Sequence, residues 1–265
     1  MDITQPTSSY NGQHAELYDL FYADKSYEDE AKFLNHCIQD YQPGTKKILE
    51  LACGTGSHSL ILEKYGYQII ATDYSIDMLT QARRKAESCN SAIYFRQMDM
   101  RSLNVPERPF DVVICLFDSI GYLITNENIL RAFVDVRSHL RPGGLFIFEF
   151  WHAPAMLRGY DPLRIRRFKV KEGEILRISE TQIDHQHSLC YVNYSIYDLK
   201  DNGYYQFLQE TQINRFFLIQ EMSNFLLQAG LFPLKWYAGF QNNEKIDANT
   251  WHIVTIAAKP EEKLK

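Results

Sequence analysis

The first 150 residues alternate between two patterns of hydrophobic positions. Stretches with apolar residues three and four positions apart have the spacing of a helix face. They predict helices at 31–41 and 57–65 and after Ser75 and Asn126, which are the expected caps of the last two. Strands that alternate with helices predict a parallel sheet covered by helices on both faces. Short apolar runs bounded by turn residues predict its buried strands, at 47–51, 68–73, 93–97, 111–116 and 145–150.

Beyond Pro154 the pattern changes to long segments rich in β-branched and aromatic residues. Asn202-Gly203 has the composition of a hairpin turn between two of them. Met222 and Leu226 then share a helix face that Gly230 is expected to end. The β-rich segments predict an antiparallel meander over 174–184, 189–199 and 204–214, and two later runs predict a return to the first sheet at 232–237 and 251–258.

The change of pattern predicts three parts of the chain. Residues 1–154 are expected to form a ligand-binding α/β core with an N-terminal helical cap. Residues 155–216 are expected to form an antiparallel β insert after the fifth strand, and 217–259 to complete the core sheet. The insert could serve as an acceptor lid, an acceptor wall or the surface of a homodimer.

Composition and charge exclude several classes of function. The 265-residue chain carries a net charge of −5, which gives no electrostatic reason to expect nucleic acid. The short basic run 164–169 is expected to be a solvated strand or loop. No apolar run is long enough to span a membrane. Five cysteines without CxxC pairing argue against a disulfide framework or zinc site, so a reducing cytoplasm is the expected location.

A glycine loop follows the first predicted strand, at Glu50–Gly56. Ligands of open α/β sheets bind beyond the carboxyl ends of the strands, where glycines let a ligand approach the backbone. A dinucleotide fingerprint needs a third glycine, and Ser59 stands there instead. The Glu50 carboxylate would repel a pyrophosphate but suits the ammonium and sulfonium charges of S-adenosylmethionine (SAM). A tight turn without a ligand is the alternative.

Two acidic residues follow the next strands. Asp73 ends the second strand and is placed to accept both hydroxyls of a ribose. Asp99 follows the third strand and could accept from an adenine amino group, with Met100 packed against the ring. Each alone could be a loop or cap residue. Together with Glu50 they form a group of three acidic residues at three neighbouring strand ends.

These segments resemble the successive motifs of class I SAM-dependent methyltransferases. The resemblance rests on Ile48–Gly56, Ala71–Asp73, Gln97–Asp99, Asp111–Leu116 and Leu140–Gly144, with Ala52 in place of the usual first glycine. It implies a Rossmann-like seven-stranded sheet whose last strand is antiparallel, and SAM as cofactor with S-adenosylhomocysteine as product. The residues expected to hold SAM are Tyr18, Glu50, Ala52, Gly54, Gly56, Asp73, Tyr74, Met78, Asp99, Met100 and Leu116.

A narrower resemblance is to nucleotide-amino-sugar N-methyltransferases of the desosamine and mycaminose type. It rests on Tyr10–Asp19, Phe117–Leu123 and Glu149–Pro154. In that family a tyrosine at the position of Tyr10 and a histidine at the position of Tyr122 lie near the acceptor amine. Glycine and sarcosine N-methyltransferases are more distant relatives of similar architecture.

The resemblance assigns acceptor-side roles as well. Tyr10 and Tyr122 are expected to orient the acceptor as the catalytic pair, although each could instead be a half-buried packing residue. Tyr22, Trp151 and His152 are expected to surround the acceptor. No metal is expected, since metal ligation in the turn at His185 and His187 would need further convergent ligands.

The leading hypothesis is an enzyme of the EC 2.1.1 class that methylates a small-molecule amine, such as a sugar-nucleotide or amino-acid amine. An O- or C-methyltransferase acting on another metabolite is a second hypothesis, because the SAM-binding half is common to all. A non-catalytic SAM-binding module is the third, and the intact loop with Asp73 and Asp99 argues against it.

Overall fold

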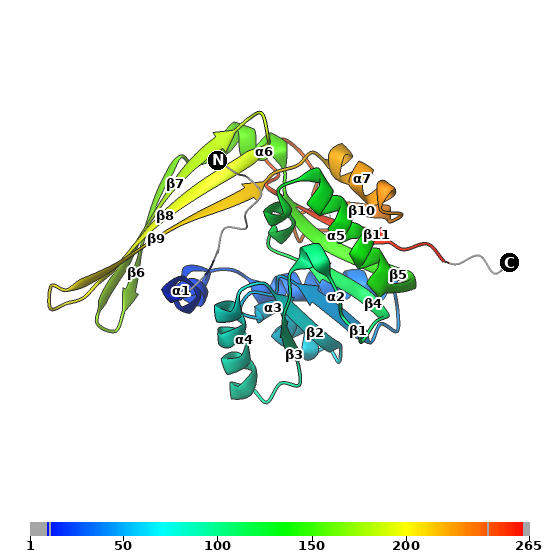
Figure 1. Cartoon of the computed structure of the whole chain (residues 1–265), viewed down its shortest axis with the longest axis horizontal. Coiled ribbons are helices and arrows are strands. Elements are labelled where there is room, and N and C mark those ends of the chain that lie inside the picture. Colours follow the sequence, from blue (N-terminus) through cyan, green and yellow to red (C-terminus); the bar gives the residue numbers. More distant parts are fainter. Residues whose placement is uncertain (1–9, 11, 243, 262–265) are drawn as a thin grey trace.

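The computed structural model describes residues 10, 12–242 and 244–261. Residues 1–9 and Asn11, which belong to the predicted N-terminal cap, lie outside the described residues. Two sheets organise the described chain, one of seven strands and one of four. Figure 1 shows the four-stranded sheet curving away from the seven-stranded sheet, with α1 (Gln13–Phe21) lying between the two.

The seven-stranded sheet confirms the predicted fold class. Its strand order is β10-β11-β5-β4-β1-β2-β3. Only β11 runs opposite to the other six strands, since it pairs antiparallel with both β5 and β10 and all other pairings are parallel. The first three strands in the chain leave the sheet at the same edge, so the loops that follow them meet there. The strands are β1 (Lys47–Leu51), β2 (Gln68–Asp73), β3 (Tyr94–Gln97), β4 (Phe110–Cys115), β5 (Leu140–Trp151), β10 (Phe232–Ala238) and β11 (His252–Ala258).

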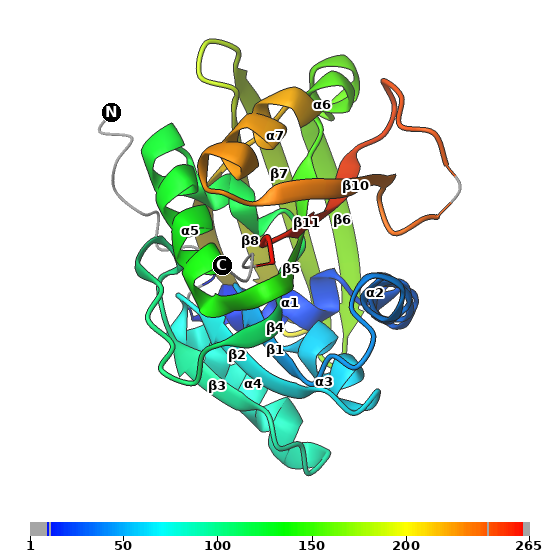
Figure 2. The same cartoon turned by 90° about the vertical axis from the view of Figure 1, so that its right-hand side faces the viewer.

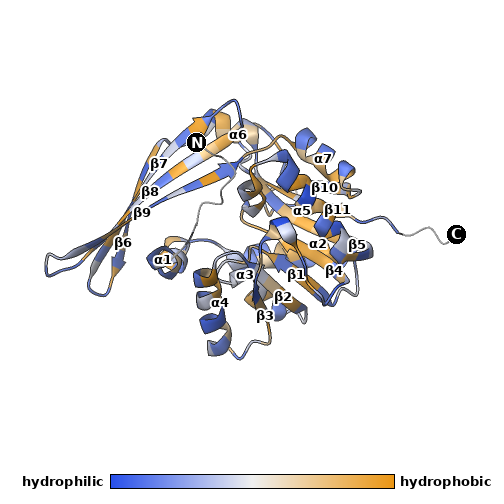
Figure 3. Cartoon of the chain, viewed as in Figure 1, coloured by the Kyte–Doolittle hydropathy of each residue, from blue (hydrophilic) through white to orange (hydrophobic). Residues whose placement is uncertain are grey.

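Helices cover both faces of this sheet, because successive strand residues point to opposite sides. Ile48 and Ile147 pack on one face and Leu49 and Phe148 on the other. Figure 2 shows the helical layers from the side, and Figure 3 shows that the strands between them are the most hydrophobic part. One face carries α2 (Tyr27–Tyr41), α3 (Ser57–Glu63) and α4 (Ile76–Ser88), and the other α5 (Asn126–His139) and α7 (Ile219–Gln228).

The four-stranded sheet follows α6 (Ala153–Gly159) and contains one more strand than predicted. The basic run lies within β6 (Leu163–Val170), so it is a strand and not a loop. This strand pairs with β7 over its whole length and lies at the edge of the sheet. The inner face of the sheet packs on α1, where Phe21 contacts Ile175 and Ile196. The remaining strands are β7 (Gly173–Asp184), β8 (Leu189–Leu199) and β9 (Tyr205–Arg215).

The helix caps are partly as predicted. The Ser75 hydroxyl accepts from the Met78 N–H at 3.2 Å and caps α4. The cap of α5 is Thr125 rather than Asn126, because the extended backbone of Thr125 lets its hydroxyl accept from the Asn128 N–H at 3.2 Å. Two 3-10 helices, η1 (Met100–Ser102) and η2 (Ser119–Leu123), follow β3 and β4. None of the described helices has the length and apolar character of a membrane span.

Candidate functional site

A deep cavity opens at the edge where β1 to β4 end. It is open to solvent and is lined by residues of the glycine loop and by side chains that follow β2, β3 and β4. The cavity brings together twelve of the predicted site residues: Tyr10, Tyr18, Glu50, Ala52, Gly54, Asp73, Tyr74, Met78, Asp99, Met100, Leu116 and Tyr122.

The glycine loop forms one wall, with its backbone in the left-handed region. Ala52 has a φ of 51° and Gly54 a φ of 57°. A glycine at position 52 would adopt this conformation without strain, which gives a physical reason for the glycine usual in the resembling family. A Cβ at Gly54 would meet only Met78 Cε at 3.5 Å, so the side of the loop facing the cavity is open.

Asp73 lies at the centre of this wall. Its Oδ2 accepts from the Gly54 N–H at 2.7 Å, and its Oδ1 from the Ser75 N–H at 2.8 Å. Burial raises the pKa of Asp73 to about 6, although these two N–H groups oppose the shift. The group is therefore mostly ionised at neutral pH. A fixed carboxylate with free lone pairs toward the cavity is suited to accept hydrogen bonds from two adjacent hydroxyls.

Asp99 is already paired within the cavity. Its carboxylate accepts from Arg101 Nε at 2.9 Å and 3.0 Å and from the Arg101 N–H at 2.9 Å. Burial alone would raise the pKa of Asp99, but these bonds outweigh it and lower the pKa. Asp99 therefore stays ionised and can offer a ligand only its remaining lone pairs. Arg101 also lines the cavity and was not singled out from the sequence.

Glu50 lines the cavity, and its nearness to a cationic ligand group stays a prediction. Its side chain is buried and accepts a hydrogen bond from Ser59, on the first turn of α3. Burial raises the pKa of Glu50, with His58 and Ser59 opposing the shift. Glu50 lines the inner end of the cavity, so a cationic group that reached it would be desolvated.

Gly56 does not line the cavity, in contrast to its predicted role in holding the cofactor. It starts α3 with a φ of 75°, and a Cβ there would lie 2.9 Å from Phe95 Cε1 and 3.3 Å from Ala82 Cβ. The absence of a side chain at Gly56 lets α3 pack closely on its neighbours. This packing is a structural reason for glycine at position 56, and its contact with the cofactor stays a prediction.

A second wall carries the two predicted catalytic tyrosines. Their hydroxyl oxygens lie 3.0 Å apart, and the Tyr10 hydroxyl donates to Gln212 Oε1 at 3.0 Å. Burial raises the pKa of both phenols, so both remain protonated at neutral pH. The pair thus forms a neutral polar spot in an aromatic wall, with Tyr18 edge-on to Tyr10 at a ring separation of 5.3 Å.

Three predicted acceptor residues lie outside the cavity lining. Tyr22 packs between Tyr18 and Phe117, with ring separations of 4.7 Å and 5.0 Å. Cys115, the last residue of β4, pairs with Phe148 of β5, so Trp151 lies roughly 10 Å further along β5. There Trp151 packs at the base of the insert, and His152 Nδ1 bonds the Thr250 carbonyl at 3.0 Å.

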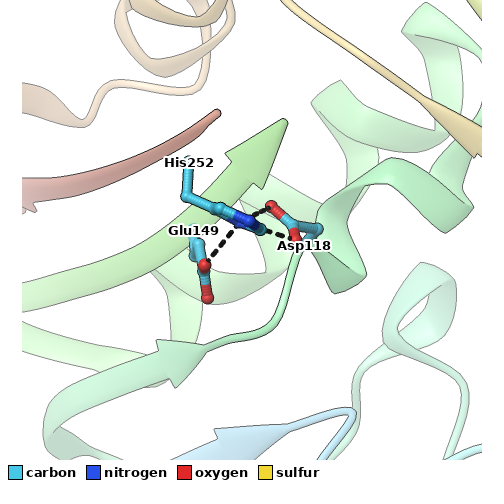
Figure 4. A group of neighbouring side chains, drawn as sticks. All are labelled: Asp118, Glu149 and His252. Atoms are coloured by element: carbon cyan, nitrogen blue, oxygen red, sulfur yellow. Dashed lines mark hydrogen bonds and ion pairs between the residues drawn. The ribbon is translucent and has the colours of Figure 1, made fainter. Parts of the chain in front are cut away.

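A charged triad that the sequence did not single out adjoins the cavity. His252 Nδ1 lies 3.0 Å from Asp118 Oδ2 and 2.9 Å from Glu149 Oε1 (Figure 4). The Phe117 N–H donates to Glu149 Oε2 at 2.7 Å. Phe117 and Asp118 are both in the left-handed region, with φ of 54° and 57°. The triad therefore holds a strained turn that projects Phe117 into the cavity wall.

The triad is organised as an ion-pair network. Burial alone would lower the pKa of His252, but the two carboxylates outweigh it and raise the pKa to about 11. His252 is therefore a cation at neutral pH. The three ligand atoms lie within 4.8 Å of one another, a spacing that would suit a metal. A metal would have to displace the proton that the carboxylates stabilise.

Comparison with known proteins agrees with this geometry. Residues 48–144 match the family described as methyltransferase domain. The domain holds the glycine loop, Asp73, Asp99 and Tyr122, and it confirms the family resemblance of the sequence motifs.

The matches to curated relatives are longer than residues 48–144. A Streptomyces venezuelae dTDP-3-amino-3,4,6-trideoxy-alpha-D-glucopyranose N,N-dimethyltransferase is 35% identical over 147 residues, which are 55% of this chain and 60% of that protein. A Streptomyces fradiae dTDP-3-amino-3,6-dideoxy-alpha-D-glucopyranose N,N-dimethyltransferase is 29% identical over 72% of this chain and 73% of its own length. The match to the first relative thus spans less than two thirds of its length.

The fold is shared with solved structures over nearly the whole chain. An S-adenosylmethionine-dependent methyltransferase from Clostridium acetobutylicum superposes with a TM-score of 0.81 at 24% identity. The superposition covers 94% of this chain and 98% of that one. The β insert and the C-terminal strands therefore belong to the shared architecture together with the methyltransferase domain.

Proposed function

We propose that this protein is a SAM-dependent methyltransferase that transfers a methyl group to the amine of a small molecule. One observation carries the proposal: a single cavity is lined by the glycine loop, by two strand-end aspartates and by a pair of tyrosines whose hydroxyls lie 3.0 Å apart. The two named relatives are N,N-dimethyltransferases of amino sugars, which supports an amine as the acceptor.

The residues of the first wall fit SAM by the chemistry of their donor and acceptor groups. Asp73 would hold the ribose hydroxyls and Asp99 the adenine amino group, with Met100 and Leu116 lining the space for the ring. When bound, SAM supplies a methyl group on a cationic sulfur. The amine takes this methyl group and releases one proton to water, and the sulfur departs as a neutral thioether.

The chain's own part in the reaction is to orient the acceptor and exclude water. The neutral hydroxyls of Tyr10 and Tyr122 would bind the acceptor, and the aromatic rings around them keep this wall dry. The amine must present a free lone pair, so it reacts in its neutral form. Proximity and alignment supply most of the rate increase in such a displacement.

The insert has a second proposed role beyond the cavity. We propose residues 155–216 as an acceptor lid attached to a core of 1–154 and 217–259. Exposed apolar side chains on its edge strands, Ile165 and Phe207, support a homodimer through this insert, which sedimentation analysis would test.

All five cysteines are free thiols, which supports a reducing, cytoplasmic setting.

The test is methyl-labelled SAM with a panel of sugar-nucleotide amines, amino acids and matching hydroxyl compounds, read by mass spectrometry. We expect labelled product from amines only. Replacing both tyrosines, Tyr10→Phe with Tyr122→Phe, should slow turnover by about 10- to 100-fold because two hydrogen bonds to the acceptor are lost. SAM affinity should stay within twofold of the wild type, since neither tyrosine is among the residues expected to hold the cofactor.

Each other outcome selects an alternative. Label on oxygen or carbon would identify an O- or C-methyltransferase that shares the cofactor wall. SAM binding without transfer to any compound in the panel would favour a non-catalytic binding module. Unchanged turnover in the double variant would refute the assignment of the two tyrosines.

A further inference from the structure

Two residues of the insert lie directly behind the acceptor tyrosines. Glu210 and Gln212 are two positions apart on β9, so their side chains share one face of the strand. Gln212 is only 4% exposed, and neither residue lines the cavity. They contact the tyrosines from the side away from any ligand.

Glu210 is fixed as an acceptor of hydrogen bonds. Its Oε1 accepts from the Tyr10 N–H at 2.9 Å, and its Oε2 lies 3.0 Å from His14 Nδ1. Burial alone would raise the pKa of Glu210, but the bonds from His14 and Tyr10 outweigh it and lower the pKa. An ionised carboxylate has no proton to donate, so His14 must carry its proton on Nδ1.

Glu210 in turn fixes the amide of Gln212. Gln212 Nε2 donates to Glu210 Oε1 at 3.1 Å. The reversed amide would place two acceptor oxygens against each other, so the carboxylate selects one orientation. In that orientation Gln212 Oε1 faces the tyrosines, 3.0 Å from the Tyr10 hydroxyl and 3.3 Å from the Tyr122 hydroxyl.

The amide oxygen then determines the direction of both tyrosine protons. Either both hydroxyls donate to Gln212 Oε1, or one donates to it and the other donates to its tyrosine neighbour at 3.0 Å. In both of these arrangements the two O–H bonds are used within this group. What the two oxygens present to the cavity is lone pairs.

We propose that Glu210 and Gln212 are positioning residues that make Tyr10 and Tyr122 hydrogen-bond acceptors, so that the site selects substrates by the N–H bonds they donate. This inference rests on the proposed function. A neutral primary amine can donate two N–H bonds to the tyrosine oxygens and keep its lone pair for the new N–C bond. An alcohol has only one O–H bond and cannot be held in the same way.

The kinetic test compares Gln212→Met with Gln209→Met, the same change at an exposed position of the same strand. With the best amine of the panel, Gln212→Met should lower kcat/KM by roughly 10-fold or more, because it removes the partner that orients two buried hydroxyls. SAM affinity should stay within twofold in both variants. Equal kinetics for the two variants would overturn the proposal.

A double-mutant cycle separates positioning from a merely structural effect. If Gln212 acts only through the tyrosine hydroxyls, Gln212→Met should have no further effect in a Tyr10→Phe/Tyr122→Phe background. A further 10-fold loss in that background would show that Gln212 acts by another route and would refute the proposal.

Neutron diffraction of the deuterated protein gives a readout that does not need turnover. Both tyrosine deuterons are expected to point toward Gln212 or toward the other tyrosine. A deuteron directed into the cavity would contradict the inference. An inactive wild-type protein with correctly directed deuterons would instead refute the proposed function and leave the hydroxyl directions established.

Discussion

At the scale of single residues, the structure separates positions that the sequence treats alike. Gly54 and Gly56 belong to one motif, and both were expected to hold the cofactor. Only Gly54 lines the cavity, while Gly56 faces Phe95 and Ala82. A sequence pattern records that a glycine is needed but not whether a ligand or a neighbouring helix requires it.

Replacing Gly56 therefore tests packing rather than binding. We expect Gly56→Ala to lower the free energy of unfolding by about 2–3 kcal/mol, since a left-handed backbone and a 2.9 Å contact with the Phe95 ring act together. Urea denaturation measures the effect. Gly66→Ala is the control, because Gly66 has a φ of 91° but an open surrounding, and it should cost only about 1 kcal/mol.

The charged triad was missed because its members come from distant parts of the chain. Asp118 follows β4, Glu149 lies in β5 and His252 begins β11. The one local signal is a glutamate inside the apolar run 145–150, since a buried carboxylate needs a partner. The sequence cannot say which of eight histidines supplies it.

The triad predicts a specific pH dependence of stability. The folded-state pKa of His252, about 11, lies above its ordinary value, so its stabilising contribution is complete below about 6.5 and is lost as the pH rises toward 11. Wild type should therefore lose its advantage over His252→Gln between pH 7 and pH 10. Chemical denaturation across that range measures the difference, which should decline only gradually because the side chain is 39% exposed.

The matched control is His36→Gln on the exposed surface of α2, where the imidazole is 57% exposed. Its difference from wild type should show little change between pH 7 and pH 10. A difference for His252→Gln that is equally independent of pH would argue against a charged imidazole in the triad.

At the scale of helices and strands, the periodicity of hydrophobic residues predicts most elements. It misses elements that form because of contacts with distant parts of the chain. All seven core strands were expected from their β-branched and apolar residues, although only β1, β2, β4, β5 and β11 are mostly buried. The basic run of β6 was expected to be a solvated strand or loop, and its charged residues hid the apolar side chains of Phe168 and Val170, which pack near Phe21. The four-residue β3 illustrates how pairing with β2 defines a strand that is short in sequence.

Lys85 connects three of these elements. Its Nζ lies 2.9 Å from Asp19 Oδ2 of α1, Thr55 Oγ1 of the glycine loop and Ser57 Oγ of α3. We expect Lys85→Met to loosen α1 and to speed amide hydrogen exchange over residues 13–21 by about fivefold, equivalent to about 1 kcal/mol. Exchange measured by mass spectrometry tests this.

The control for that experiment is Lys64→Met, which removes a surface ion pair whose side chains are more than 70% exposed. Exchange in α1 should stay at the wild-type rate in this variant. If both variants exchanged alike, α1 would be held by its apolar contacts with the insert instead.

At the scale of the whole molecule, the two walls of the cavity have different origins. The first wall comes mainly from the loops after β1, β2 and β3, whose motifs follow one another in the sequence. The acceptor wall joins Tyr10 to Glu210 and Gln212. Their contacts span about 200 residues of chain, which no local pattern encodes.

Ligand binding at the first wall should stabilise the whole fold. S-adenosylhomocysteine at 100 times its Kd should raise the free energy of unfolding by about 2.7 kcal/mol if it binds only the folded protein. Asp73→Ala should lose most of this gain at the same ligand concentration. Asp40→Ala on the exposed surface of α2 should keep it. Thermal denaturation with and without ligand makes the comparison.

The tie between residue 10 and residue 210 also sets the order in which the protein becomes competent during synthesis. A ribosome that has released the methyltransferase domain has produced every strand end of the first wall, yet the acceptor wall still lacks its support. The contacts that hold Tyr10 from the insert therefore cannot form until β9 has been synthesised. Competence would arrive only when β9 emerges and closes over the N-terminal segment.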